Sequence, residues 1–225
     1  MNSNYKVLKF KSKNLREVDD QVSIEEPLEI IIKYKEKENW IENTISITMR
    51  TPGDDEDLVR GFLFNERVIE KIDYIESIEL AGEPVGKYKL KNKAVVTINN
   101  SENIDIDKIK RNFLTNSSCG VCGKTSLDSL EIIKKDKILR SIPKIHHEII
   151  MKSPNILKQN QSEFSKTGGI HASGLFKTGG EIVAVKEDVG RHNALDKLIG
   201  FVLKQNLLKV KSFICLELAI YHSAF

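Results

Sequence analysis

The clearest pattern in the first third of the chain is an alternation of apolar and polar residues on both sides of a charged segment. Residues 28–32 and 45–49 carry the alternation, and residues 35–42 separate them. Side chains two residues apart in the sequence lie on one face of a strand, so the pattern predicts a β-hairpin between residues 22 and 50. Residues 51–53, with the sequence Thr-Pro-Gly, then end the second strand.

A helical pattern follows this hairpin. Asp54 and Asp55 are helix-capping residue types, and the next apolar residues recur at helical spacing. We therefore predict a helix from about Asp55 to Glu66 and, after it, strands over residues 74–80 and 87–98. These elements form an N-terminal α+β subdomain, which we expect to span residues 1–112. The apolar residues that define the helix are Leu58, Val59, Phe62 and Leu63.

The remainder, residues 113–225, alternates helical and strand-like patterns. Leu127, Leu130 and Ile133 recur at helical spacing directly after a segment rich in glycine and cysteine. Helices alternating with strands are typical of an α/β fold. The further elements that we predict are a helix over residues 148–161, a strand over 170–176, a turn at 178–180, a strand over 181–186 and a helix from Asn193.

Composition and charge argue against a nucleic-acid or membrane partner. The chain holds 35 basic and 32 acidic residues, and the two signs are interspersed. A nucleic-acid surface usually shows a basic block instead. The first twenty residues contain no apolar stretch of signal-peptide length, and no apolar run approaches the roughly 18 residues of a membrane span. We expect a soluble protein in the cytoplasm.

The chain has three cysteines, and two of them, Cys119 and Cys122, are only three positions apart. An odd number with this spacing is a poor disulfide framework for a chain of 225 residues. The pattern favours reduced thiols with a chemical function.

The spacing of Cys119 and Cys122 alone is compatible with zinc binding, dithiol-disulfide cycling, persulfide transport or an inert core position. A structural zinc site needs four ligands. Cys215 and the adjacent pair His146 and His147 are poor candidates for the missing ones, so we expect no metal. A zinc deaminase would also need an upstream His-x-Glu, which is absent before Cys119.

The surroundings of the two thiols favour sulfur transfer. Gly120 and Gly123 permit a mobile loop, as a sulfur that travels between partners requires. The predicted helix start and Lys124 both favour the thiolate, which is the form that attacks a sulfur donor.

Two further clusters combine glycine and histidine: residues 168–174 and residues 190–193. Taken singly, His171 and His192 could be hydrogen-bonded structural residues or catalysts. A glycine-rich turn that enters a helix can bind phosphate through free N–H groups and the helix dipole. Arg191 could add a bidentate contact to such an anion.

Taken together, the motifs resemble the FdhD/NarQ family over about residues 20–213. Their order and spacing match as well as their sequences. The motifs are Thr-Pro-Gly-Asp-Asp-Glu at 51–56 with Gly-Phe-Leu at 61–63, Ser-Cys-Gly-Val-Cys-Gly at 118–123, Gly-Ile-His-Ala at 169–172 and Glu-Asp-Val-Gly-Arg-His-Asn-Ala-Leu-Asp at 187–196.

This resemblance implies a sulfurtransferase that takes persulfide sulfur from a cysteine desulfurase. It passes the sulfur to the molybdenum cofactor bis-molybdopterin guanine dinucleotide, and formate dehydrogenase activity depends on this step. The resemblance also implies a cytidine-deaminase-like mixed-sheet core without the deaminase zinc, and a homodimer whose sites bind the guanine nucleotide ends of the cofactor. Cys119 would carry the persulfide with Cys122 as its partner. The implied cofactor contacts are Gly169, His171, Gly190, Arg191, His192 and Asn193.

The sequence departs from the family pattern near its end. Residues 214–225 do not match the expected strand end, and members that resemble this chain continue further. We therefore expect a C-terminal truncation and assign no role to Cys215 or His222. Two other functions stay open: a non-catalytic cofactor-binding chaperone of formate dehydrogenase, and a zinc-binding relative of the deaminases.

Overall fold

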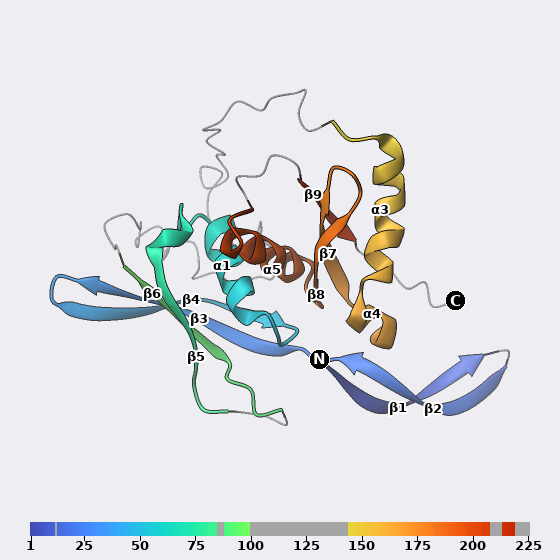
Figure 1. Ribbon diagram of the computed structural model, residues 1–225. Coiled ribbons are helices and arrows are strands. Elements are labelled where there is room, and N and C mark those ends of the chain that lie inside the picture. The colour runs from blue at the N-terminus through green and yellow to red at the C-terminus, as the bar shows by residue number, and fades with distance from the viewer. Residues whose placement is uncertain (12, 85–87, 100–143, 208–212, 219–225) are drawn as a thin grey trace, which may run out of the picture.

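The computed structural model describes residues 1–11, 13–84, 88–99, 144–207 and 213–218. The described strands form a two-stranded, a four-stranded and a three-stranded sheet, with helices between and beside the two larger ones (Figure 1). The predicted mixed α/β class is confirmed. The predicted boundary near residue 112 lies outside the described residues, as do Cys119, Cys122 and the helix predicted after them.

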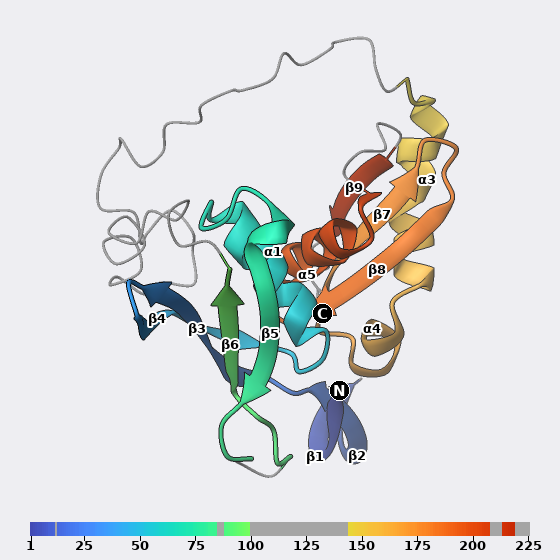
Figure 2. The ribbon, with the colours of Figure 1, turned by 60° about the vertical axis from the view of Figure 1, so that its left-hand side comes forward.

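The chain begins with a hairpin that projects from the body as an arm (Figures 1 and 2). Its strands β1 (Asn2–Lys11) and β2 (Asn14–Ser23) pair antiparallel along their whole length. We call these two strands the N-terminal arm. The sequence analysis did not predict it, because charged and apolar residues occur on both of its faces and produce no clear period of two.

The four-stranded sheet has the order β4-β3-β6-β5 and is mixed. β3 (Glu26–Glu36) and β4 (Asn39–Arg50) form the predicted hairpin. β5 (Ile75–Ala81) follows a 3-10 turn, and β6 (Lys93–Ile98) is shorter than predicted. β6 pairs parallel with β3 and antiparallel with β5, so the one parallel pair among the described strands lies in the N-terminal part of the chain.

Helix α1 (Asp55–Asn65) lies close to its predicted bounds and covers one face of this sheet. Asp54 stands at the N-cap position but makes no capping bond. Its carboxylate instead accepts a hydrogen bond from Lys186 Nζ at 2.7 Å. The buried core between helix and sheet consists of Leu28, Ile30, Ile32, Tyr34, Ile45, Leu58, Val59, Leu63, Val68, Ile69, Ala94, Val96 and Ile98.

The three-stranded sheet has the order β8-β7-β9 and is antiparallel. Its strands are β7 (His171–Lys177), β8 (Ile182–Asp188) and β9 (Phe213–Leu218). Helix α3 (His147–Gln159) lies against one face and helix α5 (Arg191–Lys204) against the other (Figure 2). Leu157 of α3 packs on Ala172 and Phe176, whereas Leu198 and Val202 of α5 pack on Leu175.

The predicted turn at residues 178–180 joins β7 and β8, and the Gly180 N–H donates to the Lys177 carbonyl at 2.9 Å. Two elements of this part were not predicted. The short helix α4 (Ser162–Thr167) follows α3, and β9 forms in the segment that the sequence analysis treated as divergent. β9 pairs with β7, a distant strand, and a local pattern does not reveal such a partner.

Helices α1 and α5 cross at the centre of the molecule and join the two larger sheets (Figures 1 and 2). Two glycines permit this close approach. A Cβ at Gly61 would overlap the backbone of Asp196, and a Cβ at Gly200 would overlap the backbone of Asp57. A larger residue at either position would push the helices apart, since protein interiors leave no room for an added methyl group.

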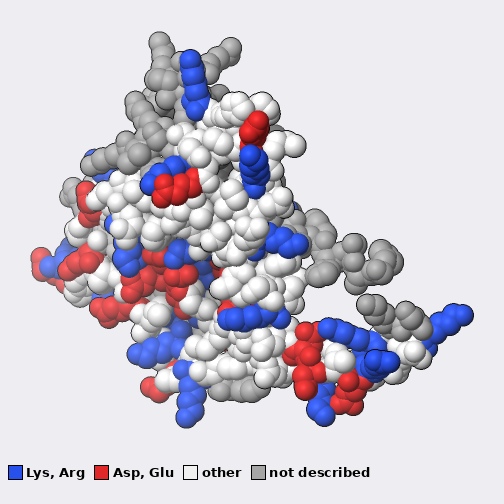
Figure 3. Space-filling model, turned by 45° about the vertical axis from the view of Figure 1, so that its right-hand side comes forward, with Lys and Arg blue, Asp and Glu red and all other residues white. Residues whose placement is uncertain are grey.

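Among the described helices, none has the length and apolar character needed to cross a bilayer. On the face drawn in Figure 3, basic and acidic side chains are interspersed.

Asp196 of α5 lies at the helix crossing and has an unusual titration. Burial raises the pKa of its carboxyl to about 7, although the hydrogen bond from Asn65 Nδ2 at 2.6 Å opposes the shift. The negative charges of Glu66 and Asp188 raise the pKa further. The folded chain therefore keeps this proton up to about neutral pH, whereas the unfolded chain loses it near pH 4.

We predict that Asp196→Asn stabilises the protein in a pH-dependent way. The raised pKa lowers the free energy of unfolding as pH increases from about 4 to about 7, and the amide variant lacks this loss. At pH 8 the free energy of unfolding of the variant should exceed that of the wild type by about 1–3 kcal/mol. This range is smaller than the full pKa shift would give, because solvent screens a partly exposed carboxyl. Urea unfolding of both proteins at pH 4, 6 and 8 measures the difference. A difference that stays constant over this range would contradict the assignment.

Candidate functional site

Three of the sequence motifs meet at one corner of the molecule. His171, at the start of β7, pairs with Asp188, at the end of β8. Thr51, which follows β4, lies beside them, because its N–H donates to the Asp188 carboxylate at 3.0 Å. The loop before β7, the loop between β8 and α5, and the end of β4 are therefore neighbours, although they are far apart in the sequence.

Asp188 is the centre of this corner and is fully buried. Its carboxylate accepts hydrogen bonds from the N–H of Gly190 at 2.8 Å and from Asn193 Nδ2 at 3.2 Å, besides the bond from Thr51. Lys197 Nζ forms an ion pair with it at 2.8 Å. We call Thr51, Asp188, Asn193 and Lys197 the Asp188 cluster. Because a buried carboxylate is tolerated only when it is paired and hydrogen-bonded, these donors explain its position.

Lys197 contributes the compensating charge from the second turn of α5 and is only 2% exposed. Its ammonium group also donates to the carbonyls of Thr51 at 2.7 Å and Glu187 at 3.2 Å. All three of its hydrogens thus have acceptors, and the acceptors come from β8 and from the residue that follows β4. The ion pair fixes α5 to both strands.

Asn193 was predicted as a cofactor contact, and its side chain forms hydrogen bonds within the protein. Its amide nitrogen donates to the Met49 carbonyl at 2.6 Å as well as to Asp188. Its amide oxygen accepts a hydrogen bond from the Thr48 hydroxyl at 3.1 Å. The structure thus gives Asn193 a positioning role at the start of α5, and a direct contact with cofactor stays a prediction.

Glu187 links this corner to the loop before β7. Its two carboxylate oxygens accept the N–H groups of Glu163 and Phe164, each at 2.9 Å, and so cap the amino end of α4. The helix ends at Gly168, whose φ of 68° is the left-handed conformation that glycine adopts without strain. Glu187 thereby holds the turn that carries Gly169 and leads into His171.

Lys186, one residue earlier on β8, connects the same strand to α1. It donates to Asp54 at 2.7 Å and to Asp57 at 2.9 Å. Burial on its own would lower the pKa of Lys186, but these two hydrogen bonds outweigh it, and the pKa lies above its usual value. Charged side chains at three successive positions of β8 therefore fix α1, α4 and α5.

Arg50 performs a similar function at the end of β4. Its guanidinium is fully buried and forms a bidentate pair with Asp55, the first residue of α1, with both N···O distances at 3.0 Å. It also donates to the carbonyl of Glu26 at 3.1 Å. The Thr-Pro-Gly turn between Arg50 and Asp55 is thus held at both ends.

The amino end of α5 is the open part of this corner. Arg191 and His192 are exposed, the first turn carries no acidic residue, and no side chain of the described residues caps this helix start. Gly190 is needed for close packing, because a Cβ there would lie 2.9 Å from Asn193 Nδ2. A helix start with uncapped N–H groups and a nearby arginine attracts anions.

His171 and Ser173 lie on the face of β7 that is turned towards α5. Among the described residues, His171 Nδ1 and Ser173 Oγ have no hydrogen-bond partner although both atoms are buried. A buried polar atom without a partner is unusual in a folded protein and requires a water molecule or another group. His171 thus keeps hydrogen-bonding capacity beside the open end of α5.

Cys119 and Cys122 lie outside the described residues, so their assignment stays a prediction. Of the other predicted site residues, Gly169, His171, Gly190, Arg191 and His192 come together around the start of α5. The sequence analysis missed the roles of Asp188, Lys197 and Thr51. An acidic residue directly after a buried strand was the available signal for Asp188, but no local feature identified Lys197, which lies on an otherwise ordinary helix.

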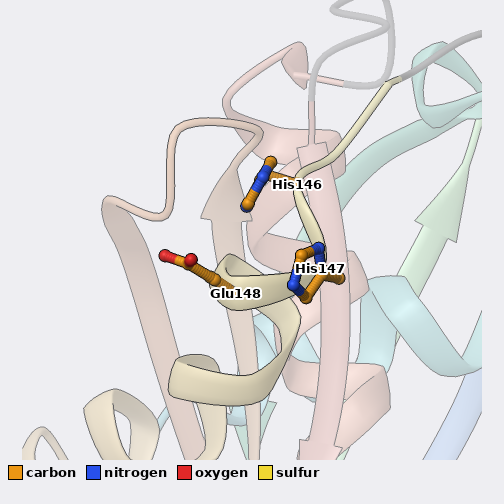
Figure 4. A group of neighbouring side chains, drawn as sticks. All are labelled: His146, His147 and Glu148. Carbon is orange, nitrogen blue, oxygen red and sulfur yellow. The ribbon is translucent and has the colours of Figure 1, made fainter.

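A second group of potential ligands lies at the start of α3 (Figure 4). His146, His147 and Glu148 are all exposed, and one potential ligand atom from each lies within 4.8 Å of the others. The three residues are consecutive and stand at the amino end of a helix, where the partial positive charge disfavours a cation. We assign no metal to this group.

The chain is similar to proteins of one family over most of its length. The model of the FdhD/NarQ family matches residues 23–216. A sulfur carrier protein FdhD from Picrophilus torridus is 43% identical over 198 residues, which are 88% of this chain and 69% of that protein. Another from Sulfurisphaera tokodaii is 38% identical over 93% of this chain and 73% of that protein.

A solved structure supports the fold. The chain resembles a crystal structure of a candidate formate dehydrogenase accessory protein from Desulfotalea psychrophila, with a TM-score of 0.56 and 21% sequence identity. The match covers 90% of this chain and 66% of that one. The extent of the family match and the identity to its members show that the chain belongs to the FdhD/NarQ family.

Proposed function

We propose that the chain is a sulfur carrier that moves persulfide sulfur from a cysteine desulfurase to bis-molybdopterin guanine dinucleotide, the cofactor of formate dehydrogenase. The observation that carries this proposal is the similarity, over most of the chain, to proteins named sulfur carrier protein FdhD. The pair Cys119 and Cys122 supplies thiols suited to that role. The name of the similar solved structure connects such proteins with formate dehydrogenase.

The first step is a thiol exchange at Cys119. Its thiolate attacks the outer sulfur of the donor's persulfide, the sulfur-sulfur bond of the donor breaks, and the donor cysteine leaves as a thiolate. A new sulfur-sulfur bond forms on Cys119, so the step needs no oxidant or reductant. Attack by Cys122 on the inner sulfur of Cys119 would then form a disulfide and release the outer sulfur as sulfide. A dithiol reductant is needed to restore the two thiols.

The open end of α5 is the proposed site for a guanine nucleotide end of the cofactor. Uncapped N–H groups and the exposed Arg191 suit a phosphate, while Gly169 and His171 lie next to this position. The binding would occur as that of a substrate, and a homodimer would present two such sites for the two nucleotide ends.

We predict that Cys119→Ala abolishes sulfur uptake. Incubated with a cysteine desulfurase and cysteine, the wild type should acquire about one cyanolysable sulfur per chain, and the variant should acquire almost none, because the attacking thiolate is missing. Cys122→Ala should still be loaded but should release little sulfide. Cys215→Ser is the matched control, since it also removes a thiol, and its loading should equal that of the wild type.

Equal loading of Cys119→Ala and wild type would remove Cys119 from the mechanism. A wild-type chain that binds cofactor but never takes up sulfur would instead indicate a chaperone, and stoichiometric zinc in the purified protein would favour a deaminase relative.

We predict that Arg191→Ala weakens binding of guanosine diphosphate about tenfold, because a charge-assisted bond to phosphate contributes on the order of 1.5–3 kcal/mol. Arg67→Ala is the control, since Arg67 is equally exposed but follows α1. Isothermal titration at two salt concentrations gives both affinities. The site would lie elsewhere if the two variants bound the nucleotide as tightly as the wild type.

A further inference from the structure

The N-terminal arm is the most isolated part of the described chain. At its base, the amino group of Met1 and Asn2 Nδ2 both contact the Glu163 carboxylate at 3.1 Å. Ser23 and Thr167 add a hydroxyl contact at 3.0 Å. Beyond these contacts the two strands extend away from the body (Figures 1 and 2). A two-stranded ribbon has little stability in water by itself, so an arm of ten-residue strands suggests a function.

The far end of the arm carries an apolar face. Phe10 pairs with Leu15, and Leu8 lies two residues from Phe10 on the same face. The three residues are 72%, 61% and 66% exposed. We call Leu8, Phe10 and Leu15 the apolar tip. Large apolar side chains grouped on an otherwise polar element are typical of a protein contact.

The opposite face of the same end is basic. Lys9 pairs with Arg16 across the ribbon, and Lys9 Nζ also forms an ion pair with Asp20 on the same face at 2.9 Å. Figure 3 shows basic side chains at the far end of the arm and carboxylates nearer the body.

The geometry points to a protein partner that grips the arm in a cleft with one apolar wall and one wall rich in carboxylates. The apolar wall would cover Phe10 and its neighbours, and the acidic wall would face Lys9 and Arg16. Such a partner matches both faces of the ribbon at once, in shape and in charge.

The same separation of the two faces argues against a lipid bilayer. An anionic membrane presents its charge and its apolar interior from one side, but Phe10 and Arg16 lie on opposite faces of the ribbon. A symmetric edge-to-edge pair of β1 with β1 of a second copy is disfavoured as well, because β1 carries three lysines and no acidic residue.

This inference rests on the proposed function for the identity of the partner. A sulfur carrier must dock on the protein that donates its sulfur, and in the proposed function the acceptor is the cofactor. The partner is therefore the cysteine desulfurase of the same organism, which the arm would hold while the thiols exchange sulfur.

Two variants of the full-length chain test the arm by different routes. Phe10→Thr removes the central apolar side chain but keeps a residue that favours strands. Arg16→Glu reverses the charge of the basic face and places a carboxylate opposite Lys9, which should strengthen the hairpin itself. Met151→Gln is the control, because Met151 is 76% exposed on α3, away from the arm.

Biolayer interferometry with the purified cysteine desulfurase measures the dissociation constants. Phe10→Thr should weaken binding about tenfold, as expected for an aromatic anchor, and Arg16→Glu about fivefold with a smaller salt dependence. Met151→Gln should bind like the wild type. Unchanged binding of both arm variants to the desulfurase, or no binding by the wild type, would overturn the inference.

Two further measurements separate the alternatives. If the wild type, but not Phe10→Thr, bound phosphatidylglycerol vesicles, the inferred protein partner would be ruled out in favour of a membrane. If Phe10→Thr alone dissociated a wild-type dimer, the inference would be overturned in favour of contact with a second copy.

Sulfur uptake from inorganic polysulfide needs no partner, so the arm variants should retain it. If the arm variants lose partner binding but keep polysulfide uptake, the result supports the arm as the docking site. If the wild type itself fails to take up sulfur from polysulfide, the result counts against the sulfur-carrier proposal only.

Discussion

The buried carboxylate of Asp188 is the constraint on which the described architecture depends. A buried ion is costly unless an opposite charge and hydrogen-bond donors surround it. The Asp188 cluster meets this requirement with groups from the end of β4, the loop after β8 and the second turn of α5. These three segments cannot separate without exposing or unpairing a charge, so they are held at one place.

The helix crossing and the charged residues of β8 extend this constraint through the molecule. Gly61 and Gly200 let α1 and α5 approach closely, so the four-stranded and three-stranded sheets become one unit. Glu187 then caps α4 and Lys186 binds the start of α1. Arg191 and His192, at the surface of this corner, are exposed and form no ion pair with another described residue. The separation of buried positioning groups from exposed binding groups is what a preorganised anion site requires.

The sequence predicted the elements whose patterns are local. The β3–β4 hairpin, α1 and α5 all appear close to their predicted bounds, because each buries one clear apolar face. The N-terminal arm escaped prediction since neither of its faces is covered, and β9 escaped because its partner β7 is distant in the sequence.

Prediction of the site had a different limit. The family resemblance implied cofactor contacts at Gly190, Arg191, His192 and Asn193, which stay predictions. It did not reveal that the amide of Asn193 bonds to Thr48, Met49 and Asp188. Spacing along a motif does not show which side chains point inward. Nor can it show that Lys197, on an amphipathic helix, neutralises an aspartate nine residues earlier.

The most direct test of this account is a double-mutant cycle between Asp188 and Lys197, with the free energy of unfolding measured in urea. Removal of one partner from a buried pair leaves an uncompensated charge and commonly costs about 3–5 kcal/mol. We expect Lys197→Met and Asp188→Asn each to lose at least about 3 kcal/mol, or to fail to fold, and the double variant to lose clearly less than the sum of the two. Single losses below about 1 kcal/mol, or strictly additive effects, would contradict the central role of this ion pair.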